Sequence, residues 1–293
     1  MRTGYKVALY GVALAVIFGG TWAVGAAAGP TPTQEAPMAH TEPHNEPKAE
    51  PGRLPPGLSV SDNGYTLQLQ EPLGFYINGP DGKPVTEFAV EHEKRLHLIV
   101  VRRDGSNFRH VHPEMAPDGK WSVPLKLEEA GSYRVFADFK PEDGPKTTLG
   151  ADVQVAGDYR PRQHPNSRTF TVDGYEVTLN GELSVGTAST VTIAISKNGA
   201  PVTDLQNYLG AKGHLVALRS ADLAYLHVHP EESAEVKFAV EVPTAGTYRL
   251  FLDFQHEGKV RTAEFTLSTA GITTPAAPQT QPQPHEEGEG HGH

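Results

Sequence analysis

Residues 84–113 read PVTEFAVEHEKRLHLIVVRRDGSNFRHVHP, and residues 201–230 read PVTDLQNYLGAKGHLVALRSADLAYLHVHP. The two stretches align without a gap at an offset of 117 residues, and 10 of their 30 positions are identical. Repetition at a fixed period indicates a duplicated structural unit. Both units keep the same histidine triplet: His97, His110 and His112 in the first copy, and His214, His227 and His229 in the second.

The pattern around both copies is typical of short β-strands separated by turns. In the second unit, strands are predicted at 175–180, 190–197, 214–219, 224–229, 236–242, 247–255 and 261–268. In the first, they are predicted at 65–70, 95–102, 108–112, 121–127, 132–140 and 147–155. No segment has helical periodicity over a helix length, which favours β-sandwiches. The segments AGSYRVFADF (130–139) and AGTYRLFLDF (245–254) share the Gly-x-Tyr strand start that is typical of a tyrosine corner.

The predicted fold class is therefore all-β, with two tandem Ig-like β-sandwich domains. We place them at residues 53–157 and 167–270, joined by a linker at 158–166. Each unit has about 105 residues, which is an ordinary size for one such domain. A Pro-rich segment at 30–52 and a His/Glu-rich tail at 271–293 are predicted to be disordered, because neither can bury a core.

The N-terminus predicts a membrane segment. Arg2 and Lys6 precede residues 7–29, which carry no charge. As a helix this stretch would span about 34 Å, enough to cross a bilayer. The positive flank would stay inside, so the domains would lie outside the cytoplasm. We expect residues 1–29 to be a single-pass anchor; the alternative is a cleaved signal peptide, since VGAAAG (24–29) offers small residues for cleavage and the protein would then be secreted.

Composition excludes several functional classes. The net charge of -10 argues against nucleic acid as a partner, because phosphate binding needs a surplus of Lys and Arg. The chain has no cysteine, which excludes disulfides, cysteine-based zinc sites and thiol catalysis. No nucleophile motif or phosphate-binding loop stands out, so the sequence does not predict an enzyme.

The histidine triplets predict a metal site in each domain, because imidazole is the commonest metal ligand. Residues two apart on a strand face the same side. If Leu218 pairs with Tyr225, then His214 lies opposite His229 on the face that also carries His227. In the first domain, the same register pairs Ile99 with His110. Both faces of these strands are mostly apolar, so we expect them to be covered on both sides.

The predicted ligands contain no sulfur and lie outside the cell. The metal that such a set favours is Cu(II) first and Zn(II) second. The predicted ligands are His97, His110, His112, His214, His227 and His229. Asp138 and Asp253 occupy matched positions and are expected either to accept a hydrogen bond from the N–H group of a ligand histidine or to act as a fourth ligand. Weak metal binding is predicted for the tail histidines His285, His291 and His293. His92, His164 and His256 have no matched copy, and we expect them to be surface residues.

The segments GHLVALRSADLAYLHVHP (213–230) and AGTYRLFLDFQHEGKVRTAEFTL (245–267) resemble exported bacterial proteins with YtkA-like domains, which are similar to CopC-like copper-resistance sandwiches. The resemblance covers most of 165–270 and, more faintly, 55–157. It implies an Ig-like fold and a metal-handling or envelope role outside the cytoplasm. CopC-like proteins bind Cu(II) near their mature N-terminus, whereas the triplets here lie in the middle of each domain.

Together these observations predict a membrane-tethered, extracytoplasmic protein that buffers or delivers copper, or zinc, through duplicated three-histidine sites. Two alternatives stay open. One is an Ig-like envelope module that binds a protein partner and no metal. The other is a zinc-dependent hydrolytic enzyme, in which three histidines hold an ion that activates water.

Overall fold

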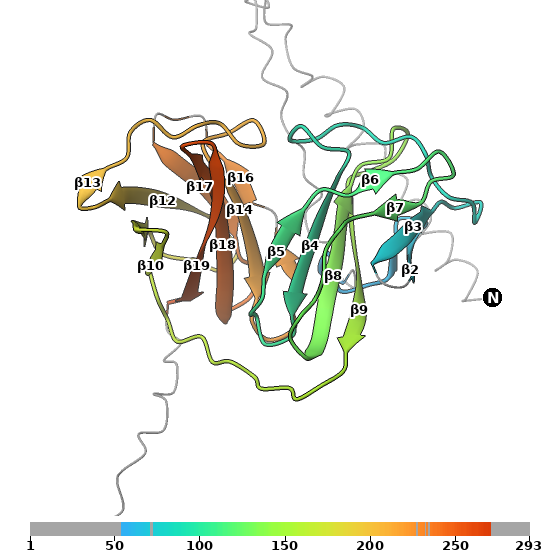
Figure 1. Ribbon diagram of the computed structural model, residues 1–293, viewed down its shortest axis with the longest axis horizontal. Helices are drawn as coiled ribbons and strands as arrows, with labels where there is room; N and C mark the ends of the chain where they lie inside the picture. Colours follow the sequence, from blue (N-terminus) through green and yellow to red (C-terminus); the bar gives the residue numbers. More distant parts are fainter. Residues whose placement is uncertain (1–53, 71–72, 227, 232, 234, 271–293) are drawn as a thin grey trace, which may run out of the picture. The chain divides into compact units, whose positions relative to one another are not determined.

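The computed structural model describes residues 54–70, 73–226, 228–231, 233 and 235–270. Within these residues the regular structure consists of β-strands, arranged as two successive sandwiches (Figure 1). This confirms the predicted all-β fold with tandem sandwiches. The predicted anchor, the Pro-rich segment and the His/Glu tail lie outside the described residues.

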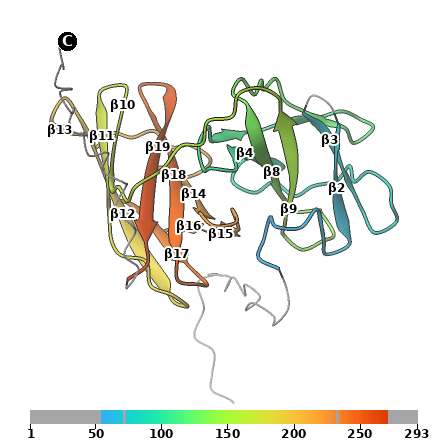
Figure 2. The same ribbon diagram turned by 90° about the horizontal axis from the view of Figure 1, so that it is seen from below.

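Each sandwich has an outer sheet and a four-stranded inner sheet, seen as separate layers in Figure 2. The first outer sheet has the order β1 (Ser61–Asp62), β2 (Tyr65–Gln70), β3 (Gly74–Asn78), β7 (Trp121–Ser122) and β6 (Glu114–Met115). The first inner sheet has the order β5 (Arg109–Val111), β4 (Leu96–Arg102), β8 (Gly131–Phe139) and β9 (Thr147–Val155).

The second sandwich repeats this plan. Its outer sheet has the order β10 (Thr169–Val172), β11 (Tyr175–Asn180), β12 (Ala188–Lys197), β17 (Val236–Glu241) and β16 (Val228–Pro230), and β13 (Ala200–Pro201) pairs with β12. Its inner sheet has the order β15 (Tyr225–Leu226), β14 (His214–Arg219), β18 (Thr247–His256) and β19 (Lys259–Ser268).

The predicted register of the inner sheets is confirmed where their strands pair, but the prediction that His214 lies opposite His229 is wrong, because His229 pairs with Ala239 in the outer sheet. Leu218 is opposite Tyr225, and Ile99 is opposite His110. The predicted strand 224–229 is wrong, because β15 belongs to the inner sheet whereas β16 pairs with β17 in the outer sheet. In the first sandwich β5 and β6 change sheets in the same way. Strands that change sheets form the corners of sandwiches, so His112 lies at a corner of the first sandwich and Val228–Pro230 at the matching corner of the second.

The tyrosine corners are also confirmed. The Tyr133 hydroxyl donates a hydrogen bond of 2.9 Å to the Glu129 carbonyl, four residues upstream. The Tyr248 hydroxyl donates one of 2.6 Å to the Thr244 carbonyl in the same way. Both tyrosines are almost fully buried, so each hydroxyl needs this partner.

The inner sheets are buried on both faces, as the apolar pattern predicts. Along β4, Leu98 and Val100 point into the core of the first sandwich, whereas Ile99 and Val101 point away from it. These outward side chains pack against the corresponding face of the second inner sheet. The shared cluster consists of Ile99, Val101, Phe108, Phe136, Val216, Leu218, Leu223, Tyr225 and Phe251. The two sandwiches are thus joined through the faces that carry the repeated motif.

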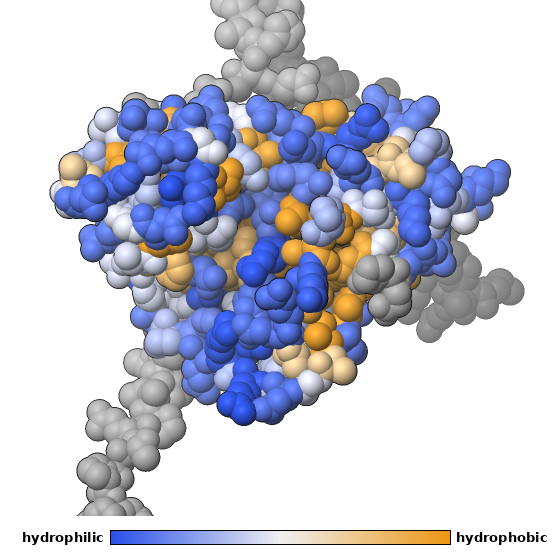
Figure 3. All heavy atoms as spheres, viewed as in Figure 1, coloured by the Kyte–Doolittle hydropathy of each residue, from blue (hydrophilic) through white to orange (hydrophobic). Residues whose placement is uncertain are grey.

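Residues just before the first sandwich also contact both sandwiches. The Pro56 carbonyl accepts a hydrogen bond of 3.0 Å from the Tyr225 amide, while the Gly57 amide donates one of 2.9 Å to the Thr148 carbonyl. Gly57 has φ +74°, and a Cβ there would lie 2.5 Å from the Phe136 ring. Only glycine fits such a position without displacing its neighbours. The face of the molecule shown in Figure 3 is mostly hydrophilic.

Replacing Phe108 by alanine tests the packing between the sandwiches. The Phe108 and Phe251 rings stack with centroids 4.0 Å apart at an interplanar angle of 5°. Truncating a buried phenylalanine costs about 3–5 kcal/mol, so Phe108→Ala should lower the free energy of unfolding by that order in chemical denaturation. The exposed-site variant Val260→Ala should change it by less than about 0.5 kcal/mol. Equal, small effects of both changes would contradict this interface.

Candidate metal centre

Three histidines of the first sandwich converge at its corner. His97 comes from β4, His110 from β5, and His112 follows directly after β5. One ring nitrogen from each lies within 4.8 Å of the others. The ring centroids are 5.3 Å apart for His97 and His110, 5.1 Å for His97 and His112, and 4.8 Å for His110 and His112. The first predicted triplet is therefore brought together.

A chain of hydrogen bonds orients two of these rings. His97 Nε2 lies 3.1 Å from the Glu91 carbonyl oxygen, to which it donates. His97 Nδ1 lies 3.0 Å from His110 Nε2. His110 Nδ1 lies 2.8 Å from Asp253 Oδ2, which comes from β18 of the second sandwich. The second sandwich thus supplies an acceptor to a ring of the first.

The chain of hydrogen bonds from Glu91 to Asp253 needs one more N–H group than two neutral imidazole rings contain. With Asp253 as a carboxylate, its contact with His110 and the Glu91 contact with His97 each take one N–H. Two neutral imidazoles then have none left for the contact between them. Either an additional shared proton occupies the 3.0 Å gap, or both nitrogens direct lone pairs at a cation.

His112 supplies a third unsatisfied nitrogen. Its Nε2 is buried and has no hydrogen-bond partner in the described residues. Burial and the charges of His110 and His97 lower the pKa of His112 to about 3. Burial and the charge of His110 lower the pKa of His97 to about 4. Both rings are therefore neutral near pH 7, which is the form that binds metal.

The second triplet does not repeat this arrangement in the described residues. His214 joins the first cluster instead: its ring is parallel to that of His97, with centroids 5.4 Å apart, and lies 4.8 Å from that of His110. His229 lies on β16, opposite Ala239 in the outer sheet, and is exposed. His227 lies outside the described residues, as do the tail residues His285, His291 and His293.

The two matched aspartates have different surroundings. Asp253 accepts from His110 and, at 2.6 Å, from the Thr262 hydroxyl. Asp138 accepts a hydrogen bond of 2.7 Å from the Thr148 hydroxyl and lies 3.8 Å from Lys146 Nζ. Both are buried. Asp138 lies opposite His97 in the strand register, whereas Asp253 hydrogen-bonds to His110 across the interface.

Of the three histidines predicted to be surface residues, His256 and His164 are less exposed than predicted. His256 is 8% exposed, and its ring bonds to the Tyr175 hydroxyl at 2.8 Å and to Asp204 at 3.0 Å. His92 is exposed, as predicted, but its ring contacts those of His97 and His214. Sequence reasoning missed this role because His92 has no matched copy. His164 is half-buried, and its Nε2 has no partner in the described residues.

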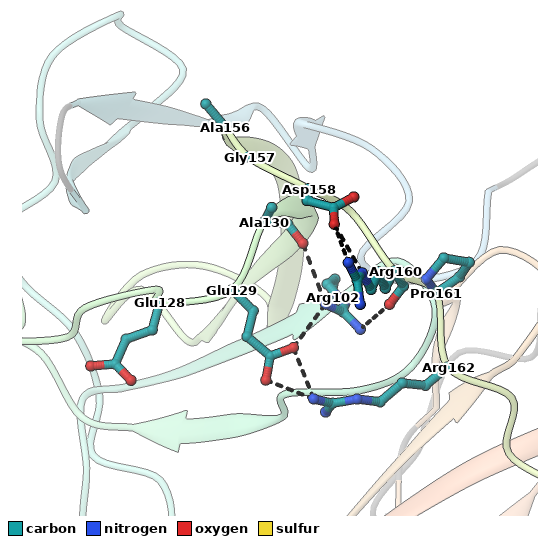
Figure 4. Close-up of a pocket in the computed structure, with 10 residues that line it drawn as sticks. All are labelled: Arg102, Glu128, Glu129, Ala130, Ala156, Gly157, Asp158, Arg160, Pro161 and Arg162. Atoms are coloured by element: carbon teal, nitrogen blue, oxygen red, sulfur yellow. Dashed lines mark hydrogen bonds and ion pairs between the residues drawn. The ribbon is translucent and has the colours of Figure 1, made fainter.

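A polar pocket lies elsewhere, where the linker meets the first sandwich (Figure 4). Arg102 occupies its centre and bonds to Asp104, Glu129 and the carbonyl of Arg160. The Arg162 side chain bonds to Glu129 as well, and its backbone amide donates to Asp104. Since these charged groups pair with one another, they fasten the linker to the first sandwich.

The geometry describes a tandem β-sandwich protein with a histidine cluster at the junction of its domains. A model of a domain of unknown function, DUF8832, matches residues 58–157 and again residues 170–271, which together are more than half of the chain. The chain belongs to this family. No curated protein matches it at a significant level. The resemblance to YtkA-like and CopC-like proteins stays a prediction.

The solved structures that are similar to this chain include the following two. One is a segment of two fibronectin type III domains from chicken tenascin, at 14% identity and a TM-score of 0.23, over 73% of this chain and 99% of that chain. The other is a titin substructure, at 14% identity and a TM-score of 0.18, over 74% of this chain and 95% of that chain. At these TM-scores, neither structure indicates a function for this chain.

No helix in the described part of the chain is long and apolar enough to cross a membrane.

The Arg102–Asp104 pair gives a prediction for the linker. Burial acts to raise the pKa of Asp104, but hydrogen bonds from Arg102, Ser106 and Arg162 outweigh it and hold that pKa well below its usual value. The carboxylate therefore stabilises the fold above a pH of about 4, and this contribution is lost as the pH falls through the lowered pKa. Asp104→Asn should cost about 1.5–3 kcal/mol at pH 7.

Denaturant unfolding of wild type and Asp104→Asn between pH 7 and pH 2.5 measures this contribution. The difference between the two proteins should shrink as the pH falls below about 4. A difference that stays constant over that range would contradict the assigned role of the carboxylate.

Proposed function

We propose that this protein binds a transition-metal ion through His97, His110 and His112, with Cu(II) preferred over Zn(II). The observation that carries the proposal is that one ring nitrogen from each of these three histidines lies within 4.8 Å of the others. His97 Nδ1 and His110 Nε2 face each other at 3.0 Å, and the buried His112 Nε2 has no partner in the described residues. Unpaired buried nitrogens are costly, and one ion satisfies all three.

The distances suit such an ion. Zinc and nitrogen lie about 2.0–2.1 Å apart in proteins, so two ligand nitrogens at an angle of about 90–110° are roughly 2.9–3.4 Å apart. The Glu91 carbonyl and the Asp253 carboxylate accept the opposite N–H groups of His97 and His110. Metal-binding histidines ordinarily have this kind of support, which fixes the tautomer and raises ligand basicity. An all-nitrogen set suits Cu(II) first and Zn(II) second.

The proposed role is to buffer or deliver metal outside the cytoplasm, with the chain held at the membrane by residues 7–29. The negative net charge of the chain favours the approach of cations. Both matched aspartates are already engaged: Asp253 by His110 and Thr262, and Asp138 by Thr148 and Lys146. Neither is free to act as a general base, so metal binding is favoured over zinc-dependent hydrolysis. A metal-free interaction module is the remaining alternative.

Thermal unfolding with and without metal tests the proposal. An ion that binds the native state at 100 times its dissociation constant stabilises it by about 2.7 kcal/mol, so Cu(II) or Zn(II) should raise the melting temperature. His112→Asn should remove most of this rise. The matched control is His164→Asn, because His164 also has a buried, unpartnered Nε2 but lies outside the cluster. A metal-free module would show no rise in any of the three proteins.

The role of Asp253 gives a separate prediction. Loss of a carboxylate that orients a metal-binding histidine typically costs 10- to 100-fold in metal affinity, so Asp253→Asn should weaken binding by about that factor. Asp138→Asn is the matched control, because it occupies the equivalent strand position and bonds to Thr148. Competition with a chelator measures both affinities. Equal losses for the two variants would contradict the contact between the domains.

A further inference from the structure

Two more imidazoles lie beside the proposed site. His214 packs against His97 and His110, and His92 packs against His214 and His97. Neither His92 nor His214 makes a hydrogen bond to the described residues through its ring, whereas His97 and His110 are engaged at both nitrogens. The cluster thus contains two imidazoles that the three-ligand site leaves unused.

The two unused rings contact each other edge to face. The centroids of His92 and His214 are 5.6 Å apart at an interplanar angle of 75°. This resembles the spacing of the three proposed ligands, whose centroids are 4.8–5.3 Å apart. The pair can therefore place two nitrogens on a second ion position, to which water would supply the other ligands. Two protein ligands hold an ion more weakly than three.

Exposure distinguishes the two positions. His97 is 4% exposed, and the His110 side chain is 1% exposed, so a hydrated ion has no direct access to them. His92 is exposed to solvent and contacts the buried His97. Within the described cluster His92 is exposed, whereas His112 and His214 are partly exposed, so His92 is the ring most open to an ion from solvent.

The backbone at His92 is also unusual. His92 and Glu93 form the centre of a tight turn with φ 46° and 64°, closed by hydrogen bonds between Glu91 and Lys94 in both directions. Positive φ is uncommon outside glycine. The matched turn of the second sandwich contains Leu209 at φ 56°, which is 3% exposed. Turn geometry therefore does not require an imidazole at this position, and His92 directs its ring at the cluster.

We propose that His92 and His214 form an outer metal position, through which the ion enters and leaves the site of His97, His110 and His112. This inference rests on the proposed function. The ion first exchanges water for the exposed His92 and for His214, and then exchanges these ligands for the three inner nitrogens. The outer position governs the rate of transfer, and the inner position governs the affinity.

His92→Asn in the full chain tests the outer position, because Asn tolerates positive φ and the turn is preserved. The matched control is Glu93→Asn in the same turn. Loading is followed by stopped-flow quenching of tryptophan fluorescence after mixing with Cu(II)–glycine, and affinity is followed by competition with a chelator. We expect His92→Asn to slow loading and release by about tenfold while the affinity stays within about threefold. Glu93→Asn should change neither quantity.

Unchanged rates in His92→Asn would overturn the outer position. A loss of affinity as large as the loss of rate would also overturn it, because His92 would then be a ligand of the inner site. The two proposals fail in different ways: a wild-type chain that binds no Cu(II) contradicts the metal site itself. A wild-type chain that binds tightly, with His92→Asn loading at the wild-type rate, contradicts the outer position alone.

Discussion

The structure depends on the burial of both faces of the inner sheets. One face of β4 closes the core of its own sandwich, and the other packs against the second sandwich through Ile99 and Val101. Each fully buried large apolar side chain contributes about 1.5–3 kcal/mol. This packing brings Asp253 to His110, and without it the histidine cluster would lose both this acceptor and the ring of His214.

The duplication has produced an asymmetric result. Both sandwiches keep the same inner-sheet order, tyrosine corner and aspartate, yet the described residues gather histidines around the triplet of the first sandwich. His214, from the second copy, completes that cluster instead of a separate one. A junction between similar domains can thus place equivalent residues in unequal roles. It also makes the proposed metal site sensitive to how the domains are held together, because His110 and its acceptor Asp253 come from different sandwiches.

Much of the fold could be predicted from the sequence because its signals are local. Alternating apolar residues gave the inner strands and their register, and the Gly-x-Tyr pattern identified both tyrosine corners. The strand predicted at 224–229 was wrong because the alternating pattern continues through a corner, where the hydrogen-bonding partner changes from β14 to β17. Pattern shows which side chains share a face, but it does not show which sheet the backbone joins.

The cluster was harder to predict because its geometry is not local. The first triplet and the importance of Asp253 could be proposed from matched positions, but the contact of Asp253 with the other domain could not. Apolar residues on both faces of a strand indicate that both faces are buried, but they do not indicate which part of the chain covers each face. His92 was missed because repetition was the criterion for choosing ligands, and Leu209 occupies the matched position. His256 was misjudged because its partners, Tyr175 and Asp204, are distant in sequence.

The most direct test of the account is the number of tight Cu(II) ions per chain, together with their ligands. A titration of the full chain followed by electron paramagnetic resonance counts the ions and reports nitrogen coordination. We expect one tight ion per chain, with a spectrum of three imidazole nitrogens that disappears in His112→Asn. Two equivalent tight ions, or a tight ion that persists in His112→Asn, would contradict a single site at the junction of the two sandwiches.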